Sequence, residues 1–381
     1  MNKKKILILT CSHGTGHKMV AKTLSDEFKN KGCEVYIHDL FDEICSPINR
    51  IAGKVYLLSY SIGRNSYKKM YYHIDHHPLG KGMHRFWFFT QKTLLHIIDK
   101  VKPDCIINVY PYTVSSMLQK KHYPDIPVFS VVTDFCVPAA WMHPSTCKYY
   151  VACQNVTQRL LTLGVNRNQI KETGIPIRNA FYQSASKERT ALKYGLDAQK
   201  RTLLIFAGTY GVLNDLDKIC LSVNTFNNLQ TIVICGKNRK LYNTLRQLHL
   251  NNVHIMGFQP EINELYQFSD MMVTKPGGIS LSEVVVSQIP IILYKPAPGQ
   301  EEENARWFQK EGAAIVTSSK PELLLAINTL YQNEVKQQAM KKNLRKMYYG
   351  HAASLITDDI LQVISPSSSS ERPNVSVSGI K

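Results

Sequence analysis

TKPGGISLSEVVVSQIPIILYKPAPGQEEEN, residues Thr274 to Asn304, is the stretch that decides the fold. It begins at the end of a short apolar strand, and its Pro276-Gly277-Gly278 turn precedes a helical pattern over Ser280 to Ser287. A second apolar strand follows at Ile291 to Tyr294, and a second helix begins near Gln300. Because strand, turn, helix and strand follow one another in this order, the stretch predicts a parallel α/β unit.

The glycine turn of this unit predicts an anion site. Gly277 and Gly278 have no Cβ, so backbone N–H groups at the helix entrance can close on an anion while the helix dipole adds positive potential. Ser280 lies in the first turn of the same helix. A phosphate is the ligand that this arrangement favours.

Polar side chains around the second helix predict a site for hydroxyl groups. Gln300, Glu301 and Asn304 fall in its first turn, and Gln300 and Asn304 share one face. Amide and carboxylate groups suit a polyol, because each sugar hydroxyl both donates and accepts. Glu283, on the first helix, can take two ribose hydroxyls in the same way. Each piece alone is also consistent with an ordinary turn or acidic helix start, but the pieces in this order favour a nucleotide-sugar site.

The amino-terminal end of the chain has a second glycine loop. Lys5 to Thr10 is a predicted buried strand, and CSHGTGHKMVAKTLSDEFKNKG is a loop that leads into an amphipathic helix. The dinucleotide-binding pattern G-x-G-x-x-G is incomplete here, because position 19 is Met. Gly14 and Gly16 are therefore weak evidence by themselves, and His17 directly after them strengthens it.

These motifs carry a resemblance to a known family. TKPGGISLSE followed by PAPGQEEEN resembles the donor site of the lipid-sugar branch of glycosyltransferase family 28, which includes diacylglycerol glucosyltransferases of Gram-positive bacteria and the plant monogalactosyldiacylglycerol synthase. The resemblance extends from about Ile6 to about Ala352. It implies the GT-B fold: two doubly wound, Rossmann-like α/β domains that face a central cleft, with the C-terminal helix crossing back to the first domain.

The resemblance also implies where catalysis occurs. His17 matches a histidine on the acceptor side of the cleft and is the candidate general base, and a helix N-terminus favours the neutral imidazole that a base requires. A helix-capping histidine without chemistry is the alternative. VVTDFCVPAAWMHP resembles the acceptor-side segment, so Asp134, Trp141 and His143 are expected to line a lipid headgroup pocket. Asp134 is the second catalytic candidate, and a purely structural aspartate is equally compatible with the pattern.

Two further segments resemble donor-binding elements. Gly208 and Gly211 form another glycine turn after a strand, and the backbone around Phe258 is expected to bind uracil. Asp215-Leu-Asp217 has the D-x-D spacing of a metal site, but its position at a helix start explains the aspartates equally well. We therefore expect no obligatory metal or other cofactor.

Composition fits a two-domain enzyme that meets an acidic surface. The chain has 381 residues, nine cysteines without a C-x-x-C pair and a net charge of +17, which predicts neither a zinc site nor a disulfide framework. The first 180 residues carry 24 Lys and Arg against 12 Asp and Glu, whereas the remainder carries 22 against 17. The basic start MNKKKILILT leads directly into the glycine loop, so we expect neither a signal peptide nor a membrane span.

The positive charge is concentrated from Pro47 to Lys102, where it alternates with aromatic residues. This mixture is typical of segments that dock on an anionic membrane, and the expected contact residues are Arg64, Lys68, Lys69 and Trp87. Packing of the rings in the core and stacking on nucleic-acid bases are the alternatives.

The sequence thus predicts three parts: an acceptor and membrane-docking domain over 1–177, a UDP-sugar domain over 178–362 and a disordered tail over 363–381. The predicted reaction is inverting transfer of glucose from UDP-glucose to diacylglycerol, and then to glucosyl-diacylglycerol, at the cytoplasmic face of the cell membrane. The products are membrane glycolipids of the kind that anchor lipoteichoic acid, and no nucleic-acid partner is expected. A transferase for another lipid or polyprenyl acceptor and a non-catalytic UDP-sugar sensor remain alternatives.

Overall fold

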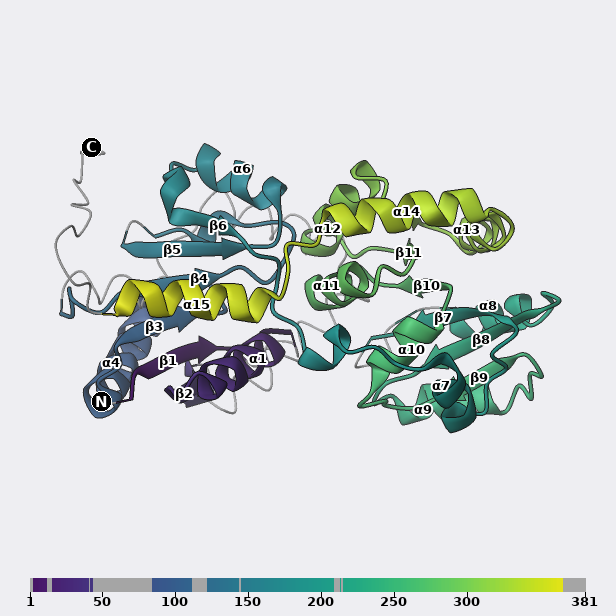
Figure 1. Cartoon of the computed structure of the whole chain (residues 1–381), viewed down its shortest axis with the longest axis horizontal. Helices are drawn as coiled ribbons and strands as arrows, with labels where there is room; N and C mark the ends of the chain where they lie inside the picture. Colours follow the sequence, from purple (N-terminus) through teal and green to yellow (C-terminus); the bar gives the residue numbers. More distant parts are fainter. Residues whose placement is uncertain are drawn as a thin grey trace.

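Two parallel six-stranded sheets, each with helices on its faces, lie side by side in the molecule (Figure 1). The computed structural model describes residues 3–11, 16–40, 42–43, 84–111, 122–143, 145–208, 213 and 215–365. The predicted α/β architecture of two facing domains is confirmed. The domain limits at residues 177 and 362 remain a prediction.

The first sheet has the strand order β2-β1-β3-β4-β5-β6. Its strands are β1 (Lys5–Thr10), β2 (Glu34–Asp39), β3 (Cys105–Asn108), β4 (Val128–Val131), β5 (Thr146–Val151) and β6 (Ile170–Glu172). Helices α1 (Gly16–Asn30), α4 (His84–Val101) and α6 (Gln154–Thr162) accompany them. Both faces of a parallel sheet are covered by helices, so β1, β3 and β4 are apolar and buried along almost their whole length.

The second sheet has the order β12-β11-β10-β7-β8-β9. Its strands are β7 (Arg201–Phe206), β8 (Leu229–Ile234), β9 (Val253–Met256), β10 (Met271–Thr274), β11 (Ile291–Tyr294) and β12 (Ala314–Thr317). The helices are α7 (Lys187–Tyr194), α8 (Leu216–Val223), α9 (Arg239–Arg246), α10 (Ile262–Phe268), α11 (Gly278–Ser287), α12 (Gln300–Lys310), α13 (Lys320–Gln332) and α14 (Glu334–Lys346).

Each sheet has a point where the strand order changes direction, and ligands of such folds bind at the carboxyl ends of the strands there. In the first sheet this point lies between β1 and β3, which pair directly. In the second sheet it lies between β7 and β10, which also pair directly. The chain that leaves β1 reaches His17, and the chain that leaves β10 reaches Gly278. The topology therefore directs both predicted glycine loops to ligand-binding edges.

The last helix, α15 (Ala352–Ile364), returns to the first domain, as expected (Figure 1). It packs along α1. The carboxylate of Asp359 accepts hydrogen bonds from Lys148 Nζ and Tyr150 Oη, each at 2.8 Å, and from Lys171 Nζ at 2.6 Å. These donors lie on β5 and β6, so one carboxylate attaches the helix to two strands.

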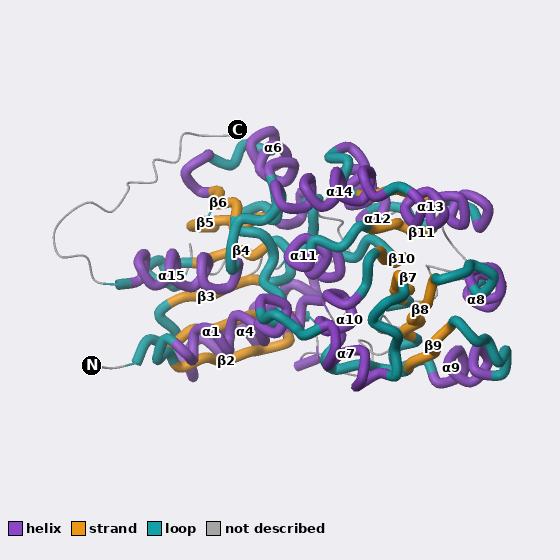
Figure 2. The backbone as a smooth tube through the Cα atoms, turned by 45° about the vertical axis from the view of Figure 1, so that its right-hand side comes forward, coloured by secondary structure: helices purple, strands orange, loops and turns teal. Residues whose placement is uncertain are grey.

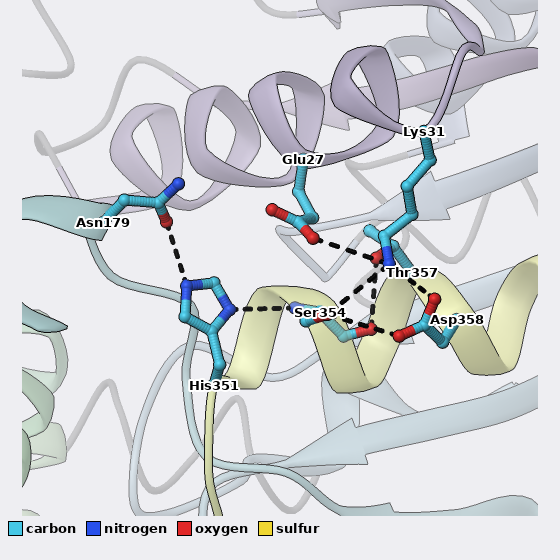
Figure 3. Close-up of polar contacts among 7 residues, drawn as sticks. All are labelled: Glu27, Lys31, Asn179, His351, Ser354, Thr357 and Asp358. Carbon is cyan, nitrogen blue, oxygen red and sulfur yellow. Dashed lines mark hydrogen bonds and ion pairs between the residues drawn. The ribbon is translucent and has the colours of Figure 1, made fainter.

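The chain crosses between the domains twice, and His351 joins the two crossings (Figure 3). Its Nδ1 accepts a hydrogen bond from Ser354 N at 3.2 Å, which caps α15. Because Nδ1 is the acceptor, Nε2 carries the proton and donates to Asn179 Oδ1 at 3.1 Å, and Asn179 belongs to the other crossing. The ring of Tyr182 also stacks on His351, with 4.2 Å between centroids.

Two further predictions concern membrane-spanning helices and the C-terminal tail. No helix within the described residues is long and apolar enough to cross a membrane. The expected tail from residue 363 begins inside the last turn of α15, and residues 366–381 lie outside the described part.

We expect Asp359→Ala to destabilise the protein much more than Asp358→Ala. The first change leaves Lys148, Lys171 and the Tyr150 hydroxyl without their common acceptor, which typically costs about 1–3 kcal/mol. Asp358 is exposed, with its hydrogen bonds to Lys31 and Ser354, and exposed pairs contribute about 0–1 kcal/mol. Urea unfolding followed by circular dichroism measures both variants. Equal losses of stability would show that Asp359 does not hold the helix.

Candidate functional site

His17 lies in the first turn of α1, at the ligand-binding edge of the first sheet. Its Nδ1 is 2.8 Å from the carbonyl oxygen of Val109, which follows β3. A carbonyl only accepts, so Nδ1 carries the proton and Nε2 is the acceptor nitrogen. Thr133 Oγ1 lies 3.1 Å from the same Nδ1, and the ring of Tyr110 meets the imidazole edge-on. The contacts fix the tautomer that a general base at Nε2 needs.

The two domains meet where Thr133 and Asp134 contact the first turn of α11. A Cβ added to Gly278 would lie 2.2 Å from Thr133 O and 2.7 Å from Asp134 Oδ1. The close approach is possible only because residue 278 is glycine. A Cβ added to Gly16, at the start of α1, would lie 3.2 Å from Ile279 Cγ1. The N-termini of α1 and α11 therefore lie close together where the domains meet.

The Asp134 carboxylate is buried and collects hydrogen bonds from the second domain. Asn304 Nδ2 donates to Oδ1 at 3.0 Å, Gln300 Nε2 donates to Oδ2, and the Gly278 N–H donates as well. Asn304 is completely buried and also joins Phe135 N at 3.1 Å and Pro276 O at 3.0 Å. Burial raises the pKa of Asp134 to about 7, although the hydrogen bonds from Asn304 and Gln300 oppose the shift.

Glu283 is a second buried carboxylate, on the face of α11 that turns toward the chain crossing. Arg178 Nη2 lies 3.3 Å from its Oε1, and Tyr266 Oη donates to Oε2 at 3.2 Å. Burial raises the pKa of Glu283 to about 7, and the Arg178 guanidinium opposes this shift. Arg178 also donates to Pro260 O at 2.7 Å, close to the loop that contains Phe258. The four residues connect the crossing to the predicted ribose and uracil sites.

The remaining predicted donor residues lie around the same edge of the second sheet. Gly208 follows β7 and has a positive φ of 80°. Phe258 follows β9, is 53% exposed and has Lys237 Nζ 5.7 Å from its ring centroid. Glu301 Oε2 accepts from Ala297 N at 2.8 Å, and Ser280 hydrogen-bonds to the Tyr266 hydroxyl. Their contacts with a donor remain predictions.

The positions of the predicted acceptor residues Trp141 and His143 do not test their predicted role. Trp141 is buried in the core of the first domain, and His143 forms a local turn in which its Nδ1 accepts from Ser145 N. Their assignment to a headgroup pocket stays a prediction. Gly14, Gly211, Arg64, Lys68 and Lys69 lie outside the described residues, as does the side chain of Trp87 in α4.

Asp215 has a partner that the sequence pattern does not indicate. Lys295 Nζ donates to Asp215 Oδ2 at 2.7 Å, and this ion pair lowers the pKa of the aspartate. Both residues have positive φ angles, 59° for Asp215 and 47° for Lys295. The ion pair joins the start of α8 to the end of β11, which gives Asp215 a structural function that does not require a metal.

Sequence reasoning missed Arg178, Tyr266 and Val109 as parts of the site. Arg178 ends the sequence Gly174-Ile-Pro-Ile-Arg178, which follows the last strand of the first sheet and has no local pattern typical of a ligand site. Tyr266 lies on α10, 17 positions from the carboxylate it binds. The contribution of Val109 is a backbone carbonyl, for which residue type carries no signal.

Comparison with known proteins identifies the family. Residues 17–177 match the family model "Monogalactosyldiacylglycerol (MGDG) synthase", and residues 196–347 match "Glycosyl transferases group 1". A "Processive diacylglycerol beta-glucosyltransferase" of Bacillus cereus is 40% identical over 361 residues, which cover 94% of this chain and 93% of that protein. The protein of the same name from Bacillus pumilus is 38% identical and covers 94% of this chain and 95% of the relative. The chain belongs to the processive diacylglycerol beta-glucosyltransferase family.

Solved structures support the fold of this glucosyltransferase family member. MurG of Acinetobacter baumannii has a TM-score of 0.66 at 14% identity and covers 94% of this chain and 100% of its own. The "S. aureus MnaA-UDP co-structure" has a TM-score of 0.62 at 14% identity, covering 95% of this chain and 97% of that one. At such low identity the likeness concerns the fold alone, and it confirms the GT-B architecture.

We expect Gly278→Ala to hold the two domains of the glucosyltransferase apart. A Cβ at this position collides with the Thr133 carbonyl, whereas a Cβ at Gly277 meets nothing within 4 Å. Small-angle scattering of the empty protein should therefore give a larger radius of gyration for Gly278→Ala and an unchanged one for Gly277→Ala. An unchanged radius for both variants would contradict the close approach.

The raised pKa of Glu283 predicts a pH dependence of stability. The folded chain keeps a proton that the unfolded chain releases between about pH 4.5 and 7, so the free energy of unfolding falls as pH rises through this window. Glu283→Gln removes this contribution. Between about pH 5 and 8 the free energy of unfolding of this variant should therefore fall less than that of the parent, by on the order of 1–3 kcal/mol. Urea unfolding at both pH values measures the difference.

Glu322→Gln is the matched control for this experiment. Hydrogen bonds, first from Ser318 N, lower the pKa of Glu322. Its titration therefore ends below the window, and the variant should keep the pH dependence of the parent between about pH 5 and 8. Equal behaviour of the two variants would show that Glu283 titrates normally.

Proposed function

We propose that this protein transfers glucose from UDP-glucose to diacylglycerol, and then to the glucosyl-diacylglycerol that it forms. One observation carries the proposal: an imidazole with its Nε2 as acceptor and the N-terminus of α11 meet at one cleft, each at the ligand-binding edge of its own sheet. A base and an anion-stabilising helix are the two groups that this transfer requires. The membership in the family supports the choice of both substrates.

The proposed chemistry is a single displacement with inversion at C1 of glucose. The acceptor hydroxyl oxygen attacks C1 while His17 Nε2 takes its proton. The bond between C1 and the phosphate oxygen breaks, and its electron pair remains on the departing UDP. The Gly278 N–H, together with the dipole of α11, stabilises the charge that develops there.

The donor is proposed to lie along the second sheet. Its ribose hydroxyls bind Glu283, the uracil binds the backbone near Phe258, and glucose hydroxyls bind Gln300, Glu301 and Asn304. This placement of the donor is supported by Arg178, which contacts both Glu283 and the carbonyl of Pro260. No metal is part of the proposal, since α11 supplies positive potential at the phosphate position.

The acceptor is proposed to reach the first domain from an anionic membrane at its cytoplasmic face. Diacylglycerol resides in a bilayer, so the enzyme must dock there reversibly as a peripheral protein. The basic and aromatic segment from Pro47 to Lys102 supports docking through its composition, and its contact residues lie outside the described part.

We expect the protein to form glucosyl-diacylglycerol and UDP when it is incubated with UDP-glucose and anionic vesicles that contain diacylglycerol. His17→Ala should lower turnover by ~10²–10⁴, the usual contribution of a positioned base. UDP affinity by calorimetry should stay close to that of the parent, because His17 contacts the acceptor and not the nucleotide. Thin-layer chromatography of labelled lipid measures the product.

Controls separate this outcome from the alternatives. His122→Ala, in an exposed loop, should keep parental turnover. A non-catalytic sensor would bind UDP-glucose without releasing UDP, and a transferase for a polyprenyl acceptor would glucosylate polyprenyl phosphate but not diacylglycerol. Full activity of His17→Ala would overturn the assignment of the base.

A further inference from the structure

The polar groups that the proposed function assigns to the donor are already occupied by the protein itself. The Gly278 N–H and the amides of Gln300 and Asn304 converge on one carboxylate, that of Asp134. Asp134 belongs to the opposite domain and is 9% exposed. The Gly278 N–H has one hydrogen, and Asn304 Nδ2 already donates to both Asp134 Oδ1 and Pro276 O, so a sugar nucleotide has to compete for these donors.

The contact also places the first domain directly against the start of α11. Thr133 O and Asp134 Oδ1 lie so close to Gly278 that a methyl group there would overlap them. The Asp134 carboxylate accepts from the Gly278 N–H, so a phosphate that binds this N–H has to displace the carboxylate. Figure 2 shows α11 at the centre of the molecule, close to the loops at the ends of the first sheet.

Contacts besides those of the Asp134 carboxylate hold the segment from Thr133 to Cys136 against the second domain. Phe135 N donates to Asn304 Oδ1 at 3.1 Å, and the Phe135 ring meets Phe308 edge-on with 4.8 Å between centroids. Cys136 Sγ contacts Gln300 O at 3.8 Å. The contacts from Thr133 to Cys136 thus join the first domain to α11 and α12 as one continuous patch.

We propose that Asp134 is an internal competitor of the donor: its carboxylate fills the anion position at the start of α11 in the empty enzyme, and UDP-glucose must displace it to bind. The inference rests on the proposed function, because it takes α11 as the donor site. Displacement also affects the acceptor side, since Thr133 Oγ1 contacts His17 Nδ1. Entry of the donor therefore releases the segment that touches the base, and Asp134 sets the affinity for the donor.

Asp134→Ala tests the competitor directly. Without the carboxylate the anion position is vacant in the empty protein, and UDP should bind more tightly than to the parent. If the occupied form makes up about nine-tenths of the empty enzyme, its loss tightens UDP binding about tenfold. Calorimetry with UDP alone measures the change. Asp134→Asn keeps one acceptor oxygen and should lie between the parent and Asp134→Ala.

Other functions of Asp134 predict different results. A catalytic base would leave UDP affinity unchanged and lower turnover only, and a direct donor ligand would weaken the binding of UDP-glucose when removed. Either result overturns the proposal. Circular dichroism melting of both variants checks that they fold, and the Asn variant, which keeps the shape of the side chain, gives the test if the Ala variant does not.

Glu283→Ala separates a failure of this inference from a failure of the proposed donor site. Glu283 is expected to bind the ribose and makes no contact with Asp134, so its removal should weaken UDP binding whatever Asp134 does. Loss of UDP affinity in Glu283→Ala without a gain in Asp134→Ala would reject the competitor alone. Unchanged affinity in both variants would show that the donor binds elsewhere, and the proposed function would fail with it.

Discussion

The N-termini of α1 and α11 lie close together where the two domains meet, and the rest of the site depends on the negative group that this arrangement favours. Each N-terminus carries unsatisfied N–H groups and a partial positive charge. A Cβ added to Gly16 would lie 3.2 Å from Ile279 Cγ1, so the two helix starts are close to each other. In the empty protein the Asp134 carboxyl group occupies this position, and in the proposed complex the diphosphate of the donor occupies it. The same physical demand thus accounts for the buried aspartate and supports the proposed affinity for a sugar nucleotide.

Asp134 and Glu283 both have a raised pKa, but their partners differ. Burial raises the pKa of each carboxyl to about 7. Glu283 has Arg178 as a permanent partner within its own site, so its charge is compensated whenever it ionises. The hydrogen-bond donors to Asp134 include the Gly278 N–H and the amides of Gln300 and Asn304, which are uncharged and belong to the other domain. Its environment therefore changes when the domains separate, whereas that of Glu283 does not depend on the distance between the sheets.

The sequence could predict the parts of the site that depend on local pattern. The strands β1 and β11 and the start of α12 at Gln300 follow from apolar runs bounded by glycine, proline and charged residues. The contacts between Asp134 and the amides of Gln300 and Asn304 span 166 and 170 positions. These contacts form because the two domains come so close together that only glycine fits at position 278. No local sequence pattern encodes this distance. The family resemblance predicts the residues on the donor side but not their contacts with Asp134.

The two chain crossings limit how the cleft can open. α15 is attached to the first domain through Asp359 and through the pair of Lys31 and Asp358, so it moves with that domain. His351 holds the end of this helix to Asn179 of the other crossing (Figure 3). Arg178, the residue before Asn179, pairs with Glu283 of α11, so this crossing is attached to the second domain as well. Glu283 and its partner Tyr266 both belong to the second domain, whereas Asp134 and its partner Asn304 belong to different domains. Separation of the domains would therefore withdraw Asp134 from α11 and leave the pair of Glu283 and Tyr266 intact, which is the geometry that an internal competitor of the donor requires.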